Sequence, residues 1–308
     1  MQLPQPVRRK VEERADSVGF AALKRAAAEL SNAYREGRAL PLATPERLAA
    51  YLVTRMAATY AAAEAVLREV RERLGETTVD SVLDLGAGSG SASLAASAVL
   101  NASRLTLVER NGAAAGFARE LLPQAAIRLE DFTHASLAPH DVVLVSYALG
   151  ETDAARVVSR LWQAARVALV IIEPGTPRGF ALIRDVRAQL LAAGAHMLAP
   201  CPRADACPVT RADWCHFAAR VERSSLHRRL KEGELNYEDE KFSYIAVARH
   251  AVRLPPARIV RRPVHQPGLI TLETCTPRGF ETVRAGKRDR ETFRAARRAD
   301  WGEAFGSV

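Results

Sequence analysis

Apolar residues recur along the chain at two different spacings, and the spacing changes near residue 76. The stretch from residue 44 to residue 74 has apolar side chains at helical intervals, as at Leu67, Val70 and Leu74. Thr44 is a suitable N-cap for such a helix, and Pro45 suits its first position. The pattern predicts an N-terminal helical region.

Beyond residue 76, short apolar runs alternate with stretches long enough for helices. Strands that alternate with helices indicate βαβ units and a mainly parallel sheet. A later run alternates as a strand does, and the stretch after it predicts two strands joined by a Pro/Gly turn. We therefore expect an α/β fold with a C-terminal β-hairpin extension. The runs are SVLDLG, LTLVER (105–110), AIRLEDF (126–132), DVVLVSYALG (141–150), RVALVIIEP (166–174), KFSYIAVARH (241–250) and RIVRRPVHQPGLITLETCT (258–276).

The composition fits a folded protein with a large core. The chain has 308 residues, of which 48% are hydrophobic, so one large α/β domain with appendages is expected. No apolar run approaches the ~20 residues of a membrane helix, and the N-terminus lacks the apolar core of a secretory signal. We expect no membrane segment and a cytoplasmic location. Structural disulfides are rare there, so the four cysteines favour metal binding or catalysis.

Positive charge is concentrated near the C-terminus. The formal net charge is +9, and residues 251–308 hold 12 Lys and Arg against 6 Asp and Glu. The densest run is RAGKRDRETFRAARR (284–298). Such a run is either a solvated helix face or an electrostatic contact for nucleic acid. Few aromatic residues interleave with it, so phosphate contact is favoured over base stacking.

A glycine-rich loop, LDLGAGSG, follows the first predicted strand. Gly86, Gly88 and Gly90 let the backbone turn tightly and approach a ligand closely. Dinucleotide-binding proteins use G-x-G-x-x-G, but here Ser91 stands where that pattern has its third glycine. The G-x-G-x-G spacing, preceded by Asp84, resembles S-adenosylmethionine-dependent methyltransferases instead.

Two acids at the ends of the next two strands, Glu109 and Asp131, extend this resemblance. It implies that the loop packs against the methionine part of the cofactor, that Glu109 takes the ribose hydroxyls and that Asp131 contacts the adenine. A carboxylate suits a diol because it accepts both hydroxyl hydrogens. The fourth strand ends in VSYALGE and lacks the N-P-P-Y-type motif of amino-group methyltransferases. We expect Ser146, Tyr147 and Glu151 to line the pocket, and we assign no catalytic residue.

The cysteines are Cys201, Cys207, Cys215 and Cys275, in the spacing C-x5-C-x7-C-x59-C. Structural zinc sites usually pair their cysteines as C-x2–4-C, whereas single cysteines at wide intervals suit the corners of a [4Fe–4S] cluster. Spacing alone leaves both open. Four unligated core cysteines fit poorly, because the first three lie among Pro, Arg and Asp. Catalysis by Cys215 with His216 is disfavoured, because neighbouring side chains in a strand point apart.

Several stretches follow one another in an order that resembles one family. They are AYLVTRMAATYAA, VLDLGAGSGSAS, LVSYALGE, IIEPGTPRGF, APCPRADACP, DWCHF, RVERSSLHRRLK, YEDEKFSYIAV, LETCTPRGF and RRADWGEAF. Together they resemble the methyltransferase-like proteins of the mitochondrial small ribosomal subunit and their bacterial relatives, from about residue 50 to near the C-terminus. One departure is Arg203, where the family usually has His after Cys-Pro.

The resemblance implies a Rossmann-like class I methyltransferase sheet, a [4Fe–4S] cluster and association with the small ribosomal subunit during assembly. The four cysteines match the ligand positions of the cluster. His216 and His227 are expected near it, either donating to sulfur or phosphate or simply packed. The expected parts are a helical region (1–75), an S-adenosylmethionine-binding core (76–198), a Cys-rich metal-binding insertion (199–235), and a last part with core strands, the Cys275 hairpin and a basic tail (236–308).

Two functions follow from these observations. The first is an rRNA methyltransferase that uses S-adenosylmethionine. The second is a non-catalytic assembly factor that binds small-subunit rRNA through its basic C-terminal region, with the cofactor or metal as a structural or sensory part. A redox protein is disfavoured, because the sequence has neither a second cluster motif nor a flavin motif. We expect a monomer.

Overall fold

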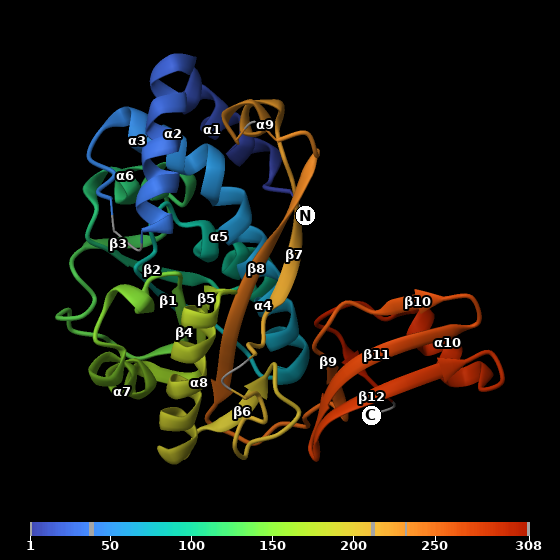
Figure 1. Ribbon diagram of the computed structural model, residues 1–308. Helices are drawn as coiled ribbons and strands as arrows, with labels where there is room; N and C mark the ends of the chain where they lie inside the picture. Colours follow the sequence, from blue (N-terminus) through green and yellow to red (C-terminus); the bar gives the residue numbers. More distant parts are fainter. Residues whose placement is uncertain (1, 37–39, 211–212, 232, 307–308) are drawn as a thin grey trace.

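The computed structural model describes residues 2–36, 40–210, 213–231 and 233–306 of the chain. A larger lobe is built on an eight-stranded sheet and a smaller lobe on a five-stranded sheet (Figure 1). The two lobes lie side by side, with the C-terminal segment in the smaller one.

The sheet of the larger lobe has the strand order β3-β2-β1-β4-β5-β8-β6, and β7 pairs with β8. The first five strands are parallel, as predicted, and β8 runs antiparallel to its three neighbours. The order reverses between β1 and β4, and ligands of such sheets bind at the carboxyl ends beside the reversal. The strands are β1 (Ser81–Leu85), β2 (Arg104–Glu109), β3 (Ala126–Leu129), β4 (His140–Ser146), β5 (Ala165–Pro174), β6 (His196–Ala199), β7 (Phe217–Glu222) and β8 (Tyr237–Ala248).

Helices cover both faces of this sheet. Alternate strand residues enter two separate cores: Val82 and Leu144 belong to one, and Leu83 and Val143 to the other. Strands buried on both faces read as continuous apolar runs, which explains the pattern in the sequence. One face carries α4 (Ala57–Leu74), α5 (Ser91–Leu100) and α6 (Gly112–Leu121); the other carries α7 (Ala154–Ala164) and α8 (Pro177–Ala192).

The N-terminal region is helical, as predicted. The Thr44 hydroxyl oxygen accepts a hydrogen bond from the Arg47 backbone N–H at 3.3 Å, and Pro45 is the first helical residue, so the predicted N-cap is confirmed. A five-residue π-helical turn then interrupts the helix, which the apolar spacing did not predict; such turns are frequent at functional sites. The elements are α1 (Gln5–Asp16), α2 (Phe20–Arg35), α3 (Pro45–Tyr51) and the π-helical η1 (Leu52–Met56).

The smaller lobe is more than the predicted hairpin. Strands β10 and β11 form that hairpin around Gly268, whose φ is +80°, but they belong to a five-stranded antiparallel sheet. This sheet and α10 enclose their own small core of Ile259, Ile270, Leu272, Ala285 and Ala296. The elements are β9 (Ala257–Ile259), β10 (Val264–Gln266), β11 (Leu269–Thr276), β12 (Gly279–Gly286), α10 (Arg290–Arg298) and β13 (Ala304–Phe305).

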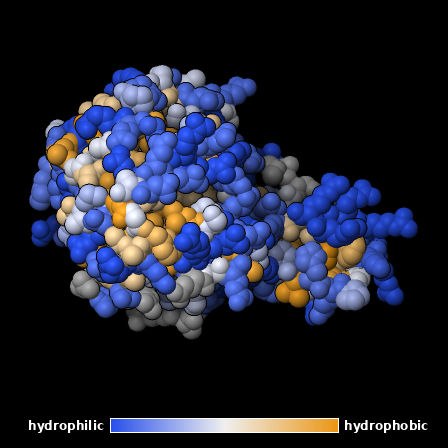
Figure 2. Space-filling view, turned by 90° about the horizontal axis from the view of Figure 1, so that it is seen from above, coloured by the Kyte–Doolittle hydropathy of each residue, from blue (hydrophilic) through white to orange (hydrophobic). Residues whose placement is uncertain are grey.

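Two further elements connect these parts. A 3-10 turn, η2 (Leu149–Glu151), follows β4, and α9 (Ser225–Lys231) follows β7. Seen from above, the surface is dominated by hydrophilic residues, and the smaller lobe extends from the main body (Figure 2).

Within the described part of the chain, no helix is both long and apolar enough to cross a membrane.

Candidate functional site

The glycine loop lies at the carboxyl end of β1, beside the reversal of strand order. Gly86, Gly88 and Gly90 have φ values of +68°, +55° and +79°, a region that side chains other than glycine disfavour. The Gly86 N–H donates to the Val108 carbonyl at 2.9 Å and thereby ties the loop to β2. A Cβ atom on Gly86 would lie 2.5 Å from the Ala148 Cβ, so the loop is packed for glycine at this position.

Asp84 is buried just before the loop. One carboxylate oxygen accepts a hydrogen bond from the Ser93 hydroxyl at 2.6 Å, and the other has no hydrogen-bond partner among the described residues. Burial raises the pKa of Asp84 to about 7, and the hydrogen bond from Ser93 opposes that rise. The loop therefore starts at a carboxyl group that is close to balance between its two protonation states near neutral pH.

Glu109 closes the loop from the end of β2. One carboxylate oxygen accepts from the Gly88 backbone N–H at 2.8 Å, and the other accepts from the Asn111 N–H at 2.6 Å. Each oxygen keeps a second lone pair, so the carboxylate can still accept from a diol. The structure thus brings Asp84, the glycine loop and Glu109 together. Their predicted roles toward a cofactor stay predictions.

Asp131 lies after β3, at the next strand end. Its carboxylate accepts hydrogen bonds from the Thr133 N–H at 2.9 Å and the Thr133 hydroxyl at 2.6 Å, and these hold the pKa of Asp131 below its usual range. A guanidinium nitrogen of Arg110 lies 3.7 Å from the Asp131 carboxylate and another lies 2.9 Å from that of Glu151. Asp131 and Glu151 therefore lie on either side of one exposed arginine.

A polar cluster lies after β4, around Tyr147; the sequence predicted Tyr147 as part of the pocket but not its partners Arg55 and Glu240. Tyr147 has a φ of +57°, a strained conformation for a large side chain, and its hydroxyl donates to Glu240 at 2.9 Å. Arg55 of the π-helical turn donates to the same carboxylate at 3.0 Å. The Tyr51 hydroxyl lies 3.4 Å from where a Cβ on Gly88 would be. The stretches AYLVTRM and YEDEK contain three of these residues, but their spacing carries no known chemistry.

The turn after β4 is held by Glu173, at the end of β5. This buried carboxylate accepts from the backbone N–H groups of Leu149 and Gly150 at 2.9 and 3.2 Å, and burial raises its pKa to about 7. Ser146 is also buried, and its hydroxyl has no hydrogen-bond partner among the described residues. Within the described part of the chain, these groups show no paired base and nucleophile.

Replacing Asp84 by Asn should stabilise the protein more at pH 8 than at pH 5. A folded-state pKa of about 7, above the unfolded value of about 3.9, means that stability falls as the pH rises from about 4 to about 7. Asparagine removes that loss. Urea unfolding at the two pH values should show a difference on the order of 2–4 kcal/mol between the effects of the substitution, at about 1.4 kcal/mol per pKa unit. Equal effects at both pH values would contradict this reading of Asp84.

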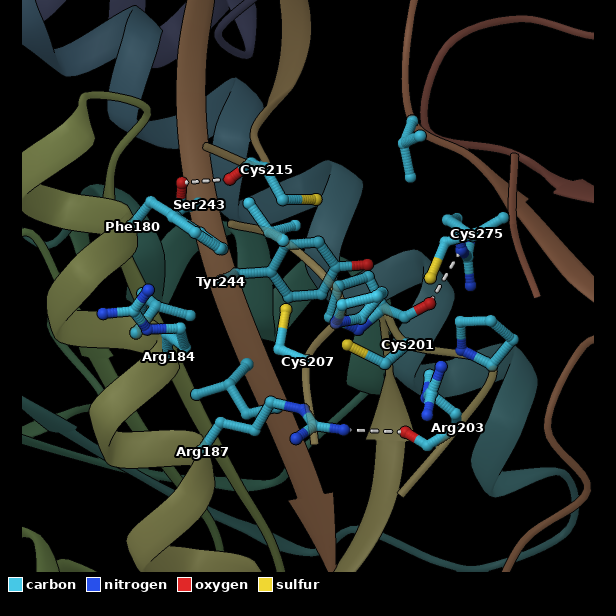
Figure 3. A pocket seen from close by; sticks show the side chains of 18 of the residues that line it. Phe180, Arg184, Arg187, Cys201, Arg203, Cys207, Cys215, Ser243, Tyr244 and Cys275 are labelled. Atoms are coloured by element: carbon cyan, nitrogen blue, oxygen red, sulfur yellow. Dashed lines mark hydrogen bonds between the residues drawn. The ribbon is translucent and has the colours of Figure 1, made fainter. Parts of the chain in front are cut away.

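The four cysteines come from two segments, the connection between β6 and β7 and strand β11, that converge on one cavity of about 50 Å³ (Figure 3). Cys201 and Cys207 lie in the loop between β6 and β7, and Cys215 lies just before β7, where its carbonyl accepts from the Ser243 hydroxyl at 2.8 Å. Cys275 lies in β11 of the smaller lobe, paired with Phe280. Within the described residues, no group of three or more His, Cys, Asp or Glu side chains has the geometry of a metal-ion site.

Burial makes three of these thiols hard to ionise. It raises the pKa of Cys201 and Cys215 above the ordinary thiol value and that of Cys275 to about 12. A thiolate in such a place needs a positive partner, and a coordinated metal deprotonates a thiol outright. The donor set is four sulfurs around one enclosed space, and it fits either zinc or an iron–sulfur cluster.

Four arginines border the same cavity. Arg258 of β9 is 2% exposed and binds the carbonyls of Pro200 at 2.9 Å and Gly302 at 2.8 Å, together with the Glu69 carboxylate of α4. It therefore joins the larger lobe, the cysteine loop and the C-terminal segment. Arg203 pairs with Asp205: its Nε donates a hydrogen bond to the Asp205 carboxylate at 2.6 Å. The other two, Arg184 and Arg187, come from α8, and of these Arg187 is the buried one.

The two histidines expected near the cysteines lie in different places. His216 is buried, with its ring centroid 5.3 Å from that of Trp214 and 4.9 Å from that of Trp301. The expectation for His227 is wrong. It lies in α9, with its Nε2 3.6 Å from Glu238 at the start of β8, about five strand residues, or ~17 Å, from the part of β8 that lines the cavity.

The basic run of the smaller lobe faces solvent at the end of β12, in the loop that follows and on α10. Its basic side chains are exposed, and among the described residues none of them forms an ion pair, whereas Arg14, Arg55, Arg220 and Arg223 of the larger lobe each pair with an acid. The residues are Arg284, Lys287, Arg288, Arg290, Arg294, Arg297 and Arg298. A set of unpaired cations on one small lobe is typical of a phosphate-binding surface.

Comparison with known proteins gives a family and a curated relative. A family described as mitochondrial small ribosomal subunit Rsm22 matches residues 45–306. The human protein "Ribosome assembly protein METTL17, mitochondrial" is 26% identical over 285 residues, which cover 82% of this chain. The chain spans 61% of the length of that relative.

Solved structures with a similar fold include methyltransferases. The magnesium protoporphyrin IX methyltransferase from Synechocystis PCC 6803, with bound SAM, is 13% identical, with a TM-score of 0.41 over 63% of this chain and 80% of that one. A SAM-dependent methyltransferase from Aquifex aeolicus is 15% identical, with a TM-score of 0.42 over 67% of this chain and 98% of that one. The strand order and the parallel register of β1–β5 define the fold here as Rossmann-like, as in class I methyltransferases.

Proposed function

Because the chain belongs to the mitochondrial small ribosomal subunit Rsm22 family, we propose that it is a methyltransferase-like assembly factor that binds small-subunit rRNA. The observation that carries this proposal is the shared cysteine cavity, which joins the basic smaller lobe to the larger lobe. A metal bound there would hold the lobe in one orientation against RNA. The human relative is named as a ribosome assembly protein, which supports a ribosomal partner.

The proposal includes S-adenosylmethionine as a bound cofactor. Its support is the glycine loop at the strand-order reversal, with Asp84 before it and Glu109 closing it. Asp131, at the next strand end, would contact the adenine. A Cβ atom on Gly86 would collide with Ala148, so the path of the loop at this position requires glycine.

The proposal also includes a metal group held by Cys201, Cys207, Cys215 and Cys275, a [4Fe–4S] cluster with zinc as the alternative. A hollow lined by all four cysteines suits a group larger than a single ion. Such a group would supply metal–sulfur bonds that cross-link the two lobes. We propose a cytoplasmic location, because a reducing compartment keeps cysteines available as ligands.

The direct test is the content of iron, acid-labile sulfide and zinc per chain in protein purified without oxygen. About four irons and four sulfides per chain are expected for one [4Fe–4S] cluster bound by four cysteines. A content of about one zinc per chain would instead indicate a structural zinc ion at this site. Protein that folds and binds rRNA with neither metal would overturn the metal part of the proposal.

A second candidate function is methylation of small-subunit rRNA. The observation that favours it is the glycine loop with a strained Tyr147 at the end of the neighbouring strand, since backbone strain clusters at active sites. Methylation of small-subunit rRNA should be mapped in cells with the protein, without it, and with Gly88→Arg. A methyl group lost in both altered strains would establish the enzyme. If the methylation map is unchanged while small subunits are defective, the protein acts as a non-catalytic assembly factor.

Neutralising two arginines of α10 should weaken rRNA binding in a salt-dependent way. Each phosphate contact contributes about 0.7–0.9 to the slope of log affinity against log salt, so Arg294→Gln with Arg297→Gln should reduce that slope by about 1.4–1.8. Arg8→Gln with Arg9→Gln is the control, because it removes the same charge from α1. The measurement is filter binding to small-subunit rRNA at several salt concentrations. Equal slopes for the two double variants would exclude α10 as the contact surface.

A further inference from the structure

The cysteine cavity contains one buried positive charge that lacks a negative partner. Arg187 is 5% exposed, and no ion pair involving it is formed among the described residues. The other three arginines of the cavity each have an acid nearby: Glu69 for Arg258, Asp205 for Arg203 and Asp185 for Arg184. An unpaired charge in a protein interior is costly, so a buried arginine without an acid calls for an anion beside it.

The hydrogen bonds of Arg187 fix where this charge lies. One terminal nitrogen donates to the carbonyls of Arg203 at 2.9 Å and Asp205 at 2.7 Å, so the side chain crosses from α8 to the loop between Cys201 and Cys207. Its Nε, which is buried, has no hydrogen-bond partner among the described residues. Figure 3 shows the guanidinium on the side of the cavity where Cys201 and Cys207 lie.

The charge of a four-cysteine metal group supplies the missing anion. Four thiolates exceed the charge of Zn²⁺, and equally that of an oxidised [4Fe–4S] core, by two negative charges. Either group would therefore place a doubly negative assembly in a cavity bordered by the buried side chains of Arg187, Arg258 and Cys275. A nearby guanidinium stabilises such an assembly by charge and by N–H donation to sulfur, and donation of this kind tunes a metal site from outside its ligands.

We propose that Arg187 is a positioning residue for the metal group, which compensates its negative charge and shapes the loop that presents Cys201 and Cys207. This inference rests on the metal site of the proposed function. It adds to that site a residue that is not a metal ligand. The role of this residue is the same whether the site holds zinc or an iron–sulfur cluster.

The test compares Arg187→Met with Arg187→Lys and with a matched control, Arg184→Met. Arg184 lies one turn earlier on α8 and borders the same cavity, but its side chain is 33% exposed. Each variant is purified without oxygen, and loss of metal to excess chelator is followed in time. We expect Arg187→Met to lose metal at least about tenfold faster than the parent protein. Arg187→Lys should be intermediate, and Arg184→Met should match the parent.

A second readout separates charge compensation from simple packing. Melting temperatures of the metal-loaded and metal-free forms are measured for all proteins. Compensation predicts that Arg187→Met lowers the melting temperature of the loaded form much more than that of the metal-free form, because the metal-free cavity holds the cation without its partner. With iron bound, the variant should also have a lower reduction potential, since loss of a positive charge disfavours the added electron.

The outcomes are distinct for the two proposals. Equal destabilisation of the loaded and metal-free forms, with unchanged metal loss, would overturn the role of Arg187 and leave the metal site standing. A parent protein that binds neither zinc nor iron would overturn the metal site itself, and with it this inference. If Arg184→Met also loses metal faster than the parent protein, any change in the cavity wall has this effect. That result would overturn a specific role for Arg187.

Discussion

Arg258→Met should lower the free energy of unfolding by about 3–5 kcal/mol, the usual result of breaking a buried ion pair from one side. The Arg258 side chain is 2% exposed, and its removal leaves Glu69 with only Arg73 and leaves two carbonyls, of Pro200 and Gly302, without this donor. Urea unfolding of parent and variant in the same metal state measures the effect.

Two controls define this expectation. Arg262→Met removes an exposed arginine whose side chain is 64% accessible and which pairs with Asp239, so it should cost less than about 1 kcal/mol. The double variant Glu69→Gln with Arg258→Met should cost less than the sum of the single changes, because it leaves no uncompensated acid. If Arg258→Met and Arg262→Met cost the same, Arg258 is not the connection between the lobes that its contacts indicate.

Cys275→Ser should remove most of the bound metal and, with it, tight rRNA binding. Cys275 is the one cysteine of the set that belongs to the smaller lobe. A serine hydroxyl is a poor replacement for a thiolate, so we expect metal content to fall about tenfold or more. The smaller lobe would then lose its metal link to the larger lobe. Metal analysis, followed by rRNA binding, measures both effects.

Thr271→Ser is the matched control, because Thr271 lies in the same strand and four residues before Cys275, on the same side of β11. It should leave metal content and rRNA binding unchanged. Unchanged metal, folding and rRNA binding in Cys275→Ser would remove Cys275 from the ligand set. It would also end the idea that a metal orients the basic lobe. Lost metal with unchanged rRNA binding would separate the two roles and overturn only the second.

Local patterns predicted the larger lobe well. The apolar runs of β1, β2, β4 and β5 are continuous because helices cover both faces of the sheet, so they are visible in the sequence without tertiary information. The N-cap at Thr44 is a local hydrogen bond and was equally predictable. The smaller lobe was underestimated for two reasons. β9 and β13 have only three and two residues, too few to produce a pattern of alternating residues, and the end of the eight-residue β12 was assigned to the basic tail because of its charge.

The parts that local patterns missed depend on contacts between distant segments. Arg258 meets Glu69 across 189 positions, and Arg55 meets Glu240 across 185. Nothing in the neighbourhood of either arginine marks it as different from the other arginines of a basic chain. The four cysteines were singled out because cysteine is rare here and its chemistry is narrow, whereas arginine is common and its role depends on its partner.

The separation of Cys275 from the other cysteines has a consequence for how the protein is made. Cys275 is added 60 residues after Cys215 (275 − 215), which takes roughly 3–12 s at about 5–20 residues per second. During that interval the growing chain carries three thiols of the site without the fourth. Under the proposed metal site, four-sulfur insertion waits until β11 has been synthesised. Bound metal would then distinguish chains completed past this strand from those that stopped before it.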